Sequence, residues 1–447
     1  MNISSSRGLS LYGKVIIIKA LVIPKMVYLF SLIPTPEVVV TELNRIIYKF
    51  LWKGTDKVTR LSAINEYEKG GLKMIDIECM IKSLRLAWLK RIFSSNRGTW
   101  KSYLCHLLVK YGGLFLFNCN FNVNDFSIHS KFYTELLQWW SDFREDFASI
   151  KDWNSIIWNN KEIRVNGSPV YYKNYFDSDI FYVSDLLFNL NNTESFDVIA
   201  KKIRKTNFLV WTGLRYSVPN YLKNNIITAA PSSKSPLLTI DNQVFDVMEK
   251  KSKQYYSLLI GKKAQLPSAA GKLQQDFNFS LDQLKQLFTL PHKVTLEPYV
   301  RAFQYKVLNS ILYTNSKLYK IGYSQQDLCT FCKSYPEKLN HLLYSCPCSK
   351  AFWDDFELFW FSGTQETINL TQQDVIVGVL SRPCPLLNYF LLIAKIYLWD
   401  CRRNQIHPNI NGFKAKILIK CETEKYIGRV NKKMEFLRVK WANFQFS

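Results

Sequence analysis

The first hundred residues carry apolar side chains at the spacing of helices. Residues 9–33 are almost continuously apolar, and Pro24 predicts two helical pieces with a kink between them. From 37 to 52 the apolar residues recur every three or four positions, which predicts an amphipathic helix. A Lys-Gly-Gly turn at 69–71 precedes a further helix, in which Arg85 is expected on the solvent side.

The middle of the chain has a weaker pattern. Between residues 110 and 235 aromatic residues are abundant but follow no single period. An Asn-Gly turn within residues 163–172 predicts a small β-hairpin. The proline- and serine-containing stretch 229–236 predicts an exposed connector, and the polar residues 262–272 predict a second loop.

Helical spacing returns in the C-terminal third. One apolar stripe runs from Leu281 to Leu287, and helices are predicted at 349–360, 386–403 and 412–440. The pair His407-Pro408 separates the last two of these helices. The apolar part of the helix at 386–403 is too short to cross a bilayer, so we expect a buried helix there.

Composition adds a strong positive charge to this helical pattern. The chain of 447 residues has a formal net charge of +23, and aromatic residues make up 15% of it. A basic, aromatic-rich protein is suited to phosphates and stacked bases, although the lysines could also serve solubility alone. Ten cysteines are too sparse for a disulfide scaffold, and the N-terminus lacks an uninterrupted signal-peptide core. We therefore expect an intracellular protein, nuclear or cytoplasmic.

Four residues form a cluster of candidate metal ligands. Cys329, Cys332, His341 and Cys346 follow the pattern C-x2-C-x8-H-x4-C, which is typical of tetrahedral zinc. The alternative is that these cysteines are small buried hydrophobic residues. Cys348 competes for the last ligand position, but Pro347 separates it from the helix face of His341, and Cys346 is preferred.

The expected fold is mainly α, with several helical units, a small zinc-binding module and a minor β-hairpin in the middle. We divide the chain into five regions by these patterns. They are an N-terminal helical region at 1–110, an aromatic-rich middle region at 111–235, a helical connector at 236–300, a zinc-binding domain at 301–370 and a C-terminal helical region at 371–447.

Two separated stretches resemble parts of non-LTR (LINE-type) retrotransposon reverse transcriptases. The first is similar to the segment after the polymerase palm, through Gly13 to Lys19, Pro24 to Tyr28, Phe50-Leu51-Trp52 and Gly70 to Asp76. The second resembles the reverse-transcriptase zinc-binding domain, through Arg301 to Gln304, Tyr313 to Asn315, the four ligands and Phe352-Trp353. The resemblance covers about half of the chain and implies a helical thumb that grips the template-primer, followed by a zinc domain. The palm and the endonuclease of that family have no counterpart in this sequence.

Polymerase chemistry needs carboxylates that hold two divalent ions. The only adjacent aspartates are Asp354 and Asp355, and neighbours on a helix point about 100° apart, which does not suit a shared metal pair. The sequence also lacks the motifs of common hydrolases. We therefore expect no catalytic residue in this chain and no enzymatic activity of its own.

Several basic residues are candidates for binding RNA or DNA, the partners that we expect, whereas no membrane partner is expected. Basic clusters are usually solvated faces, but their recurrence along the chain favours phosphate contact. The candidates are Lys19, Lys25, Lys201, Lys202, Arg204, Lys205, Lys333 and Lys338. Phe331 and Tyr335, near the zinc ligands, are candidates for stacking on unpaired bases, and packing beneath the CxxC turn is the alternative for Phe331.

The sequence therefore predicts a protein that grips element RNA or a template-primer without catalysing polymerisation. One alternative is a domesticated regulatory protein that keeps the fold but binds a protein partner. Another is a non-functional fragment of a transposable element. The sequence does not define an oligomeric state or a preferred nucleic acid.

Overall fold

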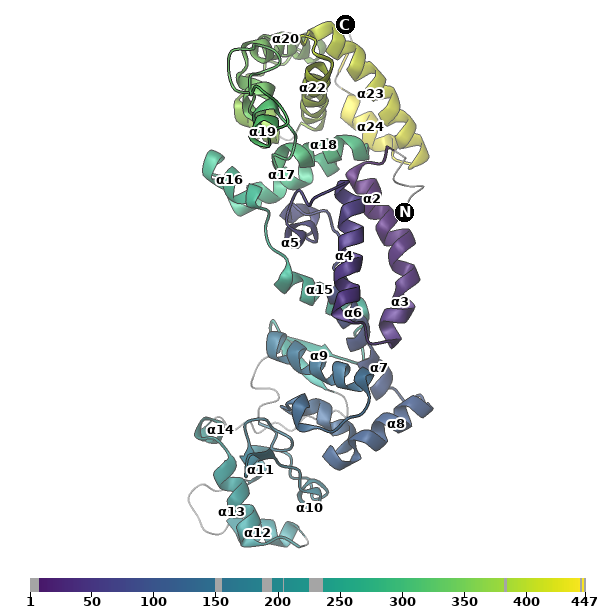
Figure 1. Ribbon diagram of the computed structural model, residues 1–447, viewed down its shortest axis with the longest axis vertical. Coiled ribbons are helices and arrows are strands. Elements are labelled where there is room, and N and C mark those ends of the chain that lie inside the picture. The colour runs from purple at the N-terminus through teal and green to yellow at the C-terminus, as the bar shows by residue number, and fades with distance from the viewer. Residues whose placement is uncertain are drawn as a thin grey trace. The chain divides into compact units, whose positions relative to one another are not determined.

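The computed structural model describes residues 8–148, 155–186, 195–203, 205–224, 236–381, 384–442 and 444–445. These residues are mainly α-helical, as predicted, and their strands form two antiparallel hairpins (Figure 1). The chain divides into two compact units. The terminal unit comprises Met1–Ile23, Glu42–Ile75 and Lys263–Ser447, and the middle unit comprises Pro24–Thr41 and Asp76–Lys262.

The five regions defined from the sequence do not coincide with these two units. Residues 1–110 in particular are divided between them. The reason is visible at Tyr12, which packs edge-on against His292 and Tyr67, with ring centroids 5.2 and 5.5 Å away. The N-terminal helix therefore packs against His292, although 280 positions separate Tyr12 from His292 in the sequence.

The apolar N-terminal stretch forms one continuous helical run. It consists of α2 (Leu11–Ile17), the π-helical turn η1 (Ile18–Val22) and α3 (Ile23–Leu32). The predicted irregularity lies in the π turn just before Pro24, where the Ile23 N–H bonds the Ile18 carbonyl. Leu11–Leu32 is long and apolar enough to cross a membrane. The buried core helix of a soluble protein and a signal sequence can have the same length and composition.

The predicted amphipathic helix has the expected bounds. Helix α4 spans Glu37–Trp52 and is followed by Lys53 in a left-handed conformation, with a φ of 54°. The Lys14 ammonium donates hydrogen bonds to the carbonyls of Phe50 and Leu51, at 3.0 and 2.8 Å. Because the last carbonyls of a helix lack partners within it, Lys14 caps the end of α4 and joins it to α2.

The remaining elements of the terminal unit are short or medium-length helices around α22. Residues Leu386–Leu398 of α22 are buried, so the prediction of a buried helix is confirmed. The elements are α5 (Arg60–Ala63), η2 (Tyr67–Lys69), α16 (Ser268–Phe277), α17 (Leu281–Val294), α18 (Pro298–Leu308), α19 (Asn315–Lys320), η7 (His341–Ser345), α20 (Pro347–Thr364), α21 (Gln372–Val377), α22 (Pro385–Asn404), α23 (Ile410–Val430) and α24 (Met434–Trp441).

Two predicted boundaries in this unit are wrong. The polar stretch 262–272 was expected to be a loop, but α16 begins at Ser268, directly after Pro267. The predicted helix 412–440 is two helices, α23 and α24, because Lys432 adopts a φ of 54° between them. The predicted break at His407-Pro408 is confirmed, since α22 ends at Asn404 and α23 begins at Ile410.

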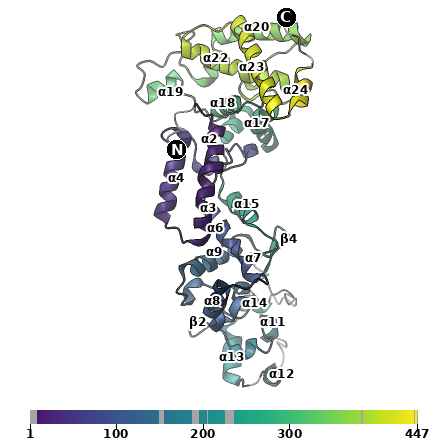
Figure 2. The same cartoon turned by 90° about the vertical axis from the view of Figure 1, so that its right-hand side faces the viewer.

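The middle unit encloses its own aromatic core, which includes Trp140, Trp158 and Tyr175. Figure 2 shows the same elements from another side. They are α6 (Ile77–Leu86), α7 (Trp88–Phe93), α8 (Thr99–Leu108), η3 (Val109–Tyr111), η4 (Gly113–Asn118), η5 (Val123–Asp125), α9 (Lys131–Phe147), β1 (Arg164–Val165), β2 (Ser168–Pro169), α10 (Lys173–Phe176), α11 (Val183–Leu186), α12 (Ser195–Lys202), α13 (Phe208–Ser217), α14 (Asn220–Asn224), β3 (Leu237–Ile240), β4 (Gln243–Asp246) and α15 (Ser252–Lys263).

The predicted hairpin at 163–172 is present as β1 and β2. Asn166 and Gly167 have φ values of 49° and 76°, which a two-residue turn between such strands requires. The prediction that Arg85 faces solvent is wrong, because Arg85 is fully buried. Its guanidinium lies 4.0 Å from the centroid of the Phe132 ring and 3.4 Å from a Glu135 oxygen. The predicted connector 229–236 lies outside the described residues, except for Pro236.

Candidate metal centre

The first two candidate ligands lie on a tight loop. A bridge between Leu328 and Pro336 closes this loop, and the Cys329 N–H bonds the Tyr335 carbonyl at 2.8 Å. Within the loop the Lys333 N–H bonds the Cys329 carbonyl at 2.9 Å, and Lys333 has a φ of 54°. This turn brings Cys329 and Cys332 to the same side, as the CxxC spacing predicts.

The other two candidate ligands lie at either end of a π-helical turn. His341 begins η7, and the Cys346 N–H bonds the His341 carbonyl at 2.8 Å. Cys346 is extended and stands at the N-cap of α20, whose first residue is Pro347. The sequence favoured Cys346 because it follows His341 by one helical turn. The turn is π-helical, which is wider than an α-helical turn. Cys346 lies between η7 and α20 and belongs to neither helix.

The four side chains meet in space. One ligand atom from each of Cys329, Cys332, His341 and Cys346 lies within 4.8 Å of all the others. The Sγ atoms of Cys329 and Cys346 are 3.9 Å apart, and Cys332 Sγ is 3.4 Å from His341 Nε2. With zinc bond lengths of about 2.3 Å to sulfur and about 2.0 Å to nitrogen, a tetrahedron has edges of about 3.8 and about 3.5 Å. The group therefore fits zinc, and Cys348 is not part of it.

The centre has a buried edge and a half-buried edge. Cys329 and Cys346 are buried, whereas Cys332 and His341 are partly exposed. A hydrogen bond from the Cys329 thiol lowers the pKa of Cys346, and the same bond, together with burial, raises the pKa of Cys329. Bound zinc would hold both as thiolates, so metal binding releases protons.

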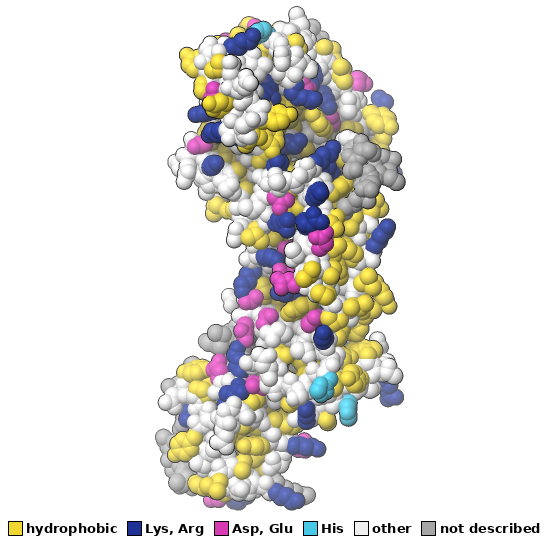
Figure 3. All heavy atoms as spheres, in the orientation of Figure 1, with side chains coloured by type: hydrophobic (Ala, Val, Ile, Leu, Met, Phe, Trp, Pro, Cys, Tyr) yellow, Lys and Arg dark blue, Asp and Glu magenta, His cyan; other side chains and the backbone are white. Residues whose placement is uncertain are grey.

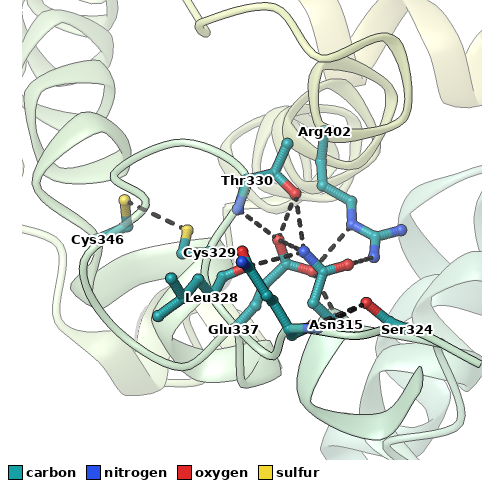
Figure 4. A network of polar contacts seen from close by, with 9 residues as sticks. Asn315, Ser324, Leu328, Cys329, Thr330, Glu337, Cys346 and Arg402 are labelled. Carbon is teal, nitrogen blue, oxygen red and sulfur yellow. Dashed lines mark hydrogen bonds and ion pairs between the residues drawn. The ribbon is translucent and has the colours of Figure 1, made fainter. Parts of the chain in front are cut away.

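A buried carboxylate inside the ligand loop organises the loop backbone (Figure 4). Glu337 is fully buried, and its oxygens accept bonds from the Thr330 N–H at 2.8 Å and the Thr330 hydroxyl at 2.6 Å. They also accept a bond from the Asn315 N–H at 2.9 Å. Arg402 of α22 donates from Nε to Glu337 at 3.0 Å and from Nη2 to Asn315 Oδ1 at 2.8 Å. The loop that carries the CxxC pair is therefore fastened to α19 and α22.

Sequence reasoning did not identify Glu337, Asn315 or Arg402 as part of the centre. Asn315 belongs to the stretch that resembles the reverse-transcriptase zinc-binding domain, and Arg402 lies 65 positions after Glu337. The one available signal was an acidic residue within the loop between two ligands. Residues that hold a ligand loop in place affect metal affinity although they do not touch the metal.

The structure places the candidate nucleic-acid residues in both units. Lys19, Lys333 and Lys338 belong to the terminal unit, and Lys25, Lys201, Lys202 and Lys205 belong to the middle unit. All seven side chains are exposed, whereas Arg204 lies outside the described residues. On the face drawn in Figure 3, Lys and Arg side chains are scattered among hydrophobic ones and do not gather in one large patch.

The two aromatic candidates beside the centre differ in exposure. Phe331 is only 4% exposed and packs in the core, so the alternative of packing beneath the CxxC turn is confirmed. Tyr335 is 59% exposed, and its ring centroid lies 5.7 Å from that of His341. Tyr335 is therefore the aromatic side chain that remains accessible next to the ligands.

The two adjacent aspartates lie where the sequence predicts. Asp354 and Asp355 are neighbours on α20, and both are exposed, whereas Phe352, Trp353 and Phe356 of the same helix are buried. Their exposure agrees with a solvated role on the outer face of this helix.

Comparison with known proteins supports the same assignment for the metal centre. Residues 276–353 match the family model described as zinc-binding in reverse transcriptase, and the matched range contains all four candidate ligands. No curated protein matches the chain. The matched region and the geometry of the centre together support a reverse-transcriptase-related protein with a zinc-binding domain.

Proposed function

We propose that the chain is the nucleic-acid-binding C-terminal portion of a LINE-type reverse transcriptase and that its zinc domain grips single-stranded RNA. The observation that carries the proposal is a zinc centre inside a reverse-transcriptase zinc-binding region, surrounded by exposed cationic and aromatic side chains. Zinc would hold the CxxC loop in shape. Lys333 lies on that loop and Lys338 lies two residues after the bridge that closes it. Both would contact phosphates, while Tyr335 would stack on a base.

The chain as it stands would position element RNA or a template-primer, and polymerase chemistry would be carried out elsewhere. The overall charge of +23 favours this role because phosphates attract such a protein at long range. The exposed pair Asp354 and Asp355 offers no geometry for two metal ions on one face of a helix.

Salt dependence separates the roles assigned to these three side chains. For single strands, each phosphate contact contributes a slope of about −0.7 in a plot of log affinity against log salt. Lys333→Ala with Lys338→Ala should therefore reduce the slope by up to about 1.4, whereas Tyr335→Ala should weaken binding by about 1–3 kcal/mol and leave the slope unchanged. The measurement is fluorescence anisotropy with a labelled single-stranded RNA at several salt concentrations.

A matched control removes two lysines from the same unit. Lys285 and Lys293 are exposed and lie on α17. Replacing both with alanine lowers the net charge equally, so this variant should keep the wild-type slope. If the control and the loop variant lose the same slope, the effect comes from net charge and the loop is not a binding site.

One observation favours the alternative of a protein partner. The segment 24–41 of the middle unit exposes large apolar side chains, of which Tyr28 is 71% and Val38 is 79% exposed. Figure 3 shows hydrophobic side chains gathered over α3. Exposed apolar patches often mark protein interfaces. Binding through such a patch would change little with salt, which distinguishes it from phosphate contact.

A further inference from the structure

A cleft in the middle unit lies between the β3–β4 hairpin and the first half of α15. Its volume is about 450 Å³, within the range of roughly 300–1,000 Å³ that is usual for pockets that bind small ligands. Figure 2 labels β4 and α15, the two elements that form its walls. The cleft is lined on the hairpin side by Ile240, Val244 and Phe245, and on the helix side by Lys250, Lys253 and Leu258, among others.

The local sequence explains why this hollow forms. Asp241 and Asn242 have φ values of 50° and 61°, so the hairpin closes in a tight two-residue turn. Ile240 pairs with Gln243 across that turn. On the other wall, the lining residues 253, 254, 257 and 258 follow the three- and four-residue spacing of one face of α15, and Lys250 lies just before the helix begins. The Gln254 side chain accepts a bond from the Lys251 N–H at 3.1 Å and so fixes the start of α15.

The cleft combines positive charge with an apolar floor. The Lys250 ammonium lies 5.1 Å from the centroid of the Phe245 ring, which places it at the inner wall. Lys250 and Lys253 provide two positive charges, and Asp241 is the one acidic side chain among the described residues that line the cleft. The floor is apolar, since Ile240 and Phe245 are each 7% exposed, whereas Val244 at the edge is 70% exposed.

We propose that this cleft binds one nucleotide unit of a single-stranded nucleic acid. The ammonium groups of Lys250 and Lys253 would hold its phosphate, and the base would lie against the apolar floor formed by Ile240 and Phe245, which share one face of the hairpin. The side-chain amides of Gln243 and Gln254, which also line the cleft, would face the edge of the base. A paired duplex does not fit this arrangement because its bases are stacked inside the helix. The inference rests on the proposed function and adds a second contact site, in the other unit.

Two changes test the cleft in the full-length protein. Lys250→Ala with Lys253→Ala removes the charge, whereas Ser257→Trp fills the cleft and leaves the charge unchanged, because Ser257 is a lining residue. With a labelled twelve-nucleotide oligouridylate, each variant should bind about fivefold to tenfold more weakly than the wild type. The charge variant should also lose about 0.7 of the salt slope, equal to one phosphate contact.

The matched control is Lys90→Ala with Lys110→Ala, two exposed lysines of the same unit that do not line the cleft. It should bind the oligonucleotide as the wild type does. Circular dichroism should show that Ser257→Trp keeps the wild-type helix content, and if it does not, Ser257→Phe replaces it. Double-stranded RNA of the same length should compete poorly for the site.

The outcomes separate this inference from the proposed function. Wild-type affinity in both cleft variants, together with weaker binding in the Lys333 and Lys338 variant, would overturn the cleft alone. Equal competition by duplex RNA would overturn the single-strand assignment. Absence of any oligonucleotide binding by the wild-type protein would overturn both proposals together.

Discussion

The Glu337 carboxylate, which lies between two zinc ligands in the sequence, forms an ion pair with the Arg402 guanidinium at 3.0 Å. The Glu337 side chain is fully buried, and only 11% of the Arg402 side chain is exposed. The pair fastens the ligand loop to α22, the central helix of the terminal unit. The zinc centre is thus connected to the core of this unit and is not an independent appendage.

This ion pair should be strongly coupled to stability and to metal binding. Arg402→Met leaves the Glu337 charge buried without its ion partner, and we expect the free energy of unfolding to fall by about 3–5 kcal/mol. Glu337→Gln with Arg402→Met should lose less than the sum of the two single changes, because neither charge is then left alone. Zinc affinity should fall about tenfold or more in the single variants. Urea unfolding and competition with a metal chelator measure the two effects, and strictly additive losses would contradict the coupling.

Lys395 should make the terminal unit more stable at alkaline pH. It is fully buried, its ammonium bonds the Ile376 carbonyl at 3.1 Å, and burial lowers its pKa to about 7. The folded state therefore loses this proton at a lower pH than the unfolded state does. The cost of burying the charge is complete below pH 7 and disappears as the pH rises from about 7 to about 10.5.

Lys395→Met should remove this dependence. We expect the variant to be more stable than the wild type below pH 7, by about 1–4 kcal/mol. The difference should narrow as the pH rises toward 10. Urea unfolding at several pH values measures it, and Lys433→Met, a change at an exposed lysine of the same unit, serves as the control. A constant difference at every pH would show that Lys395 does not titrate between the two states.

Gly71 should tolerate no side chain. A Cβ atom at this position would lie 2.1 Å from the Asn65 carbonyl oxygen, which is backbone and cannot move aside easily. Gly71→Ala should therefore lower the free energy of unfolding by about 3 kcal/mol or more. Gly271→Ala is the matched control, because Gly271 lies within α16 with open space around it, and this change should stabilise by about 0.5–1 kcal/mol. Similar thermal melting curves for the two variants would refute the close approach.

The exposed aspartates of α20 should have no catalytic role. We expect no primer extension by the purified chain with magnesium or manganese. Asp354→Ala with Asp355→Ala should leave the zinc content and the melting temperature unchanged, because both side chains are exposed. Extension that persists in this double variant would reveal a catalytic metal site formed by other residues.

Helices and the ligand set could be predicted from the sequence because their signals are local. The bounds of α4 and the four zinc-centre residues follow from spacing alone. Similarly, an Asn-Gly pair was sufficient to predict the β1–β2 hairpin.

The features that could not be predicted from the sequence depend on contacts between residues that are distant along the chain. Arg85 has the charge of a surface residue, yet it is buried, with its guanidinium over the Phe132 ring and beside the Glu135 carboxylate. The Glu337–Arg402 pair joins positions that no periodicity relates. The division into two units likewise depends on tertiary packing, which brings Tyr12 against His292.

In the proposed function, the zinc centre shapes a surface that binds single-stranded RNA. Cys332 is one of the four candidate ligands, and Lys333 is its exposed neighbour. Loss of structural zinc removes folding free energy from the whole loop, roughly 10–16 kcal/mol in small zinc domains, whereas loss of one lysine removes a single phosphate contact. Because Cys332→Ser should unfold the loop, we expect proteases to cleave this variant first within residues 320–350.

The most direct measurement is the affinity of wild type, Cys332→Ser, Lys333→Ala and Lys338→Ala for one single-stranded RNA at one stated salt concentration. Metal analysis of each preparation should accompany it and should give one zinc per wild-type chain. We predict that Cys332→Ser weakens binding more than either lysine change does. Equal RNA affinity for the wild type and a zinc-free Cys332→Ser protein would contradict an RNA-binding role for the zinc domain and would favour a protein partner instead.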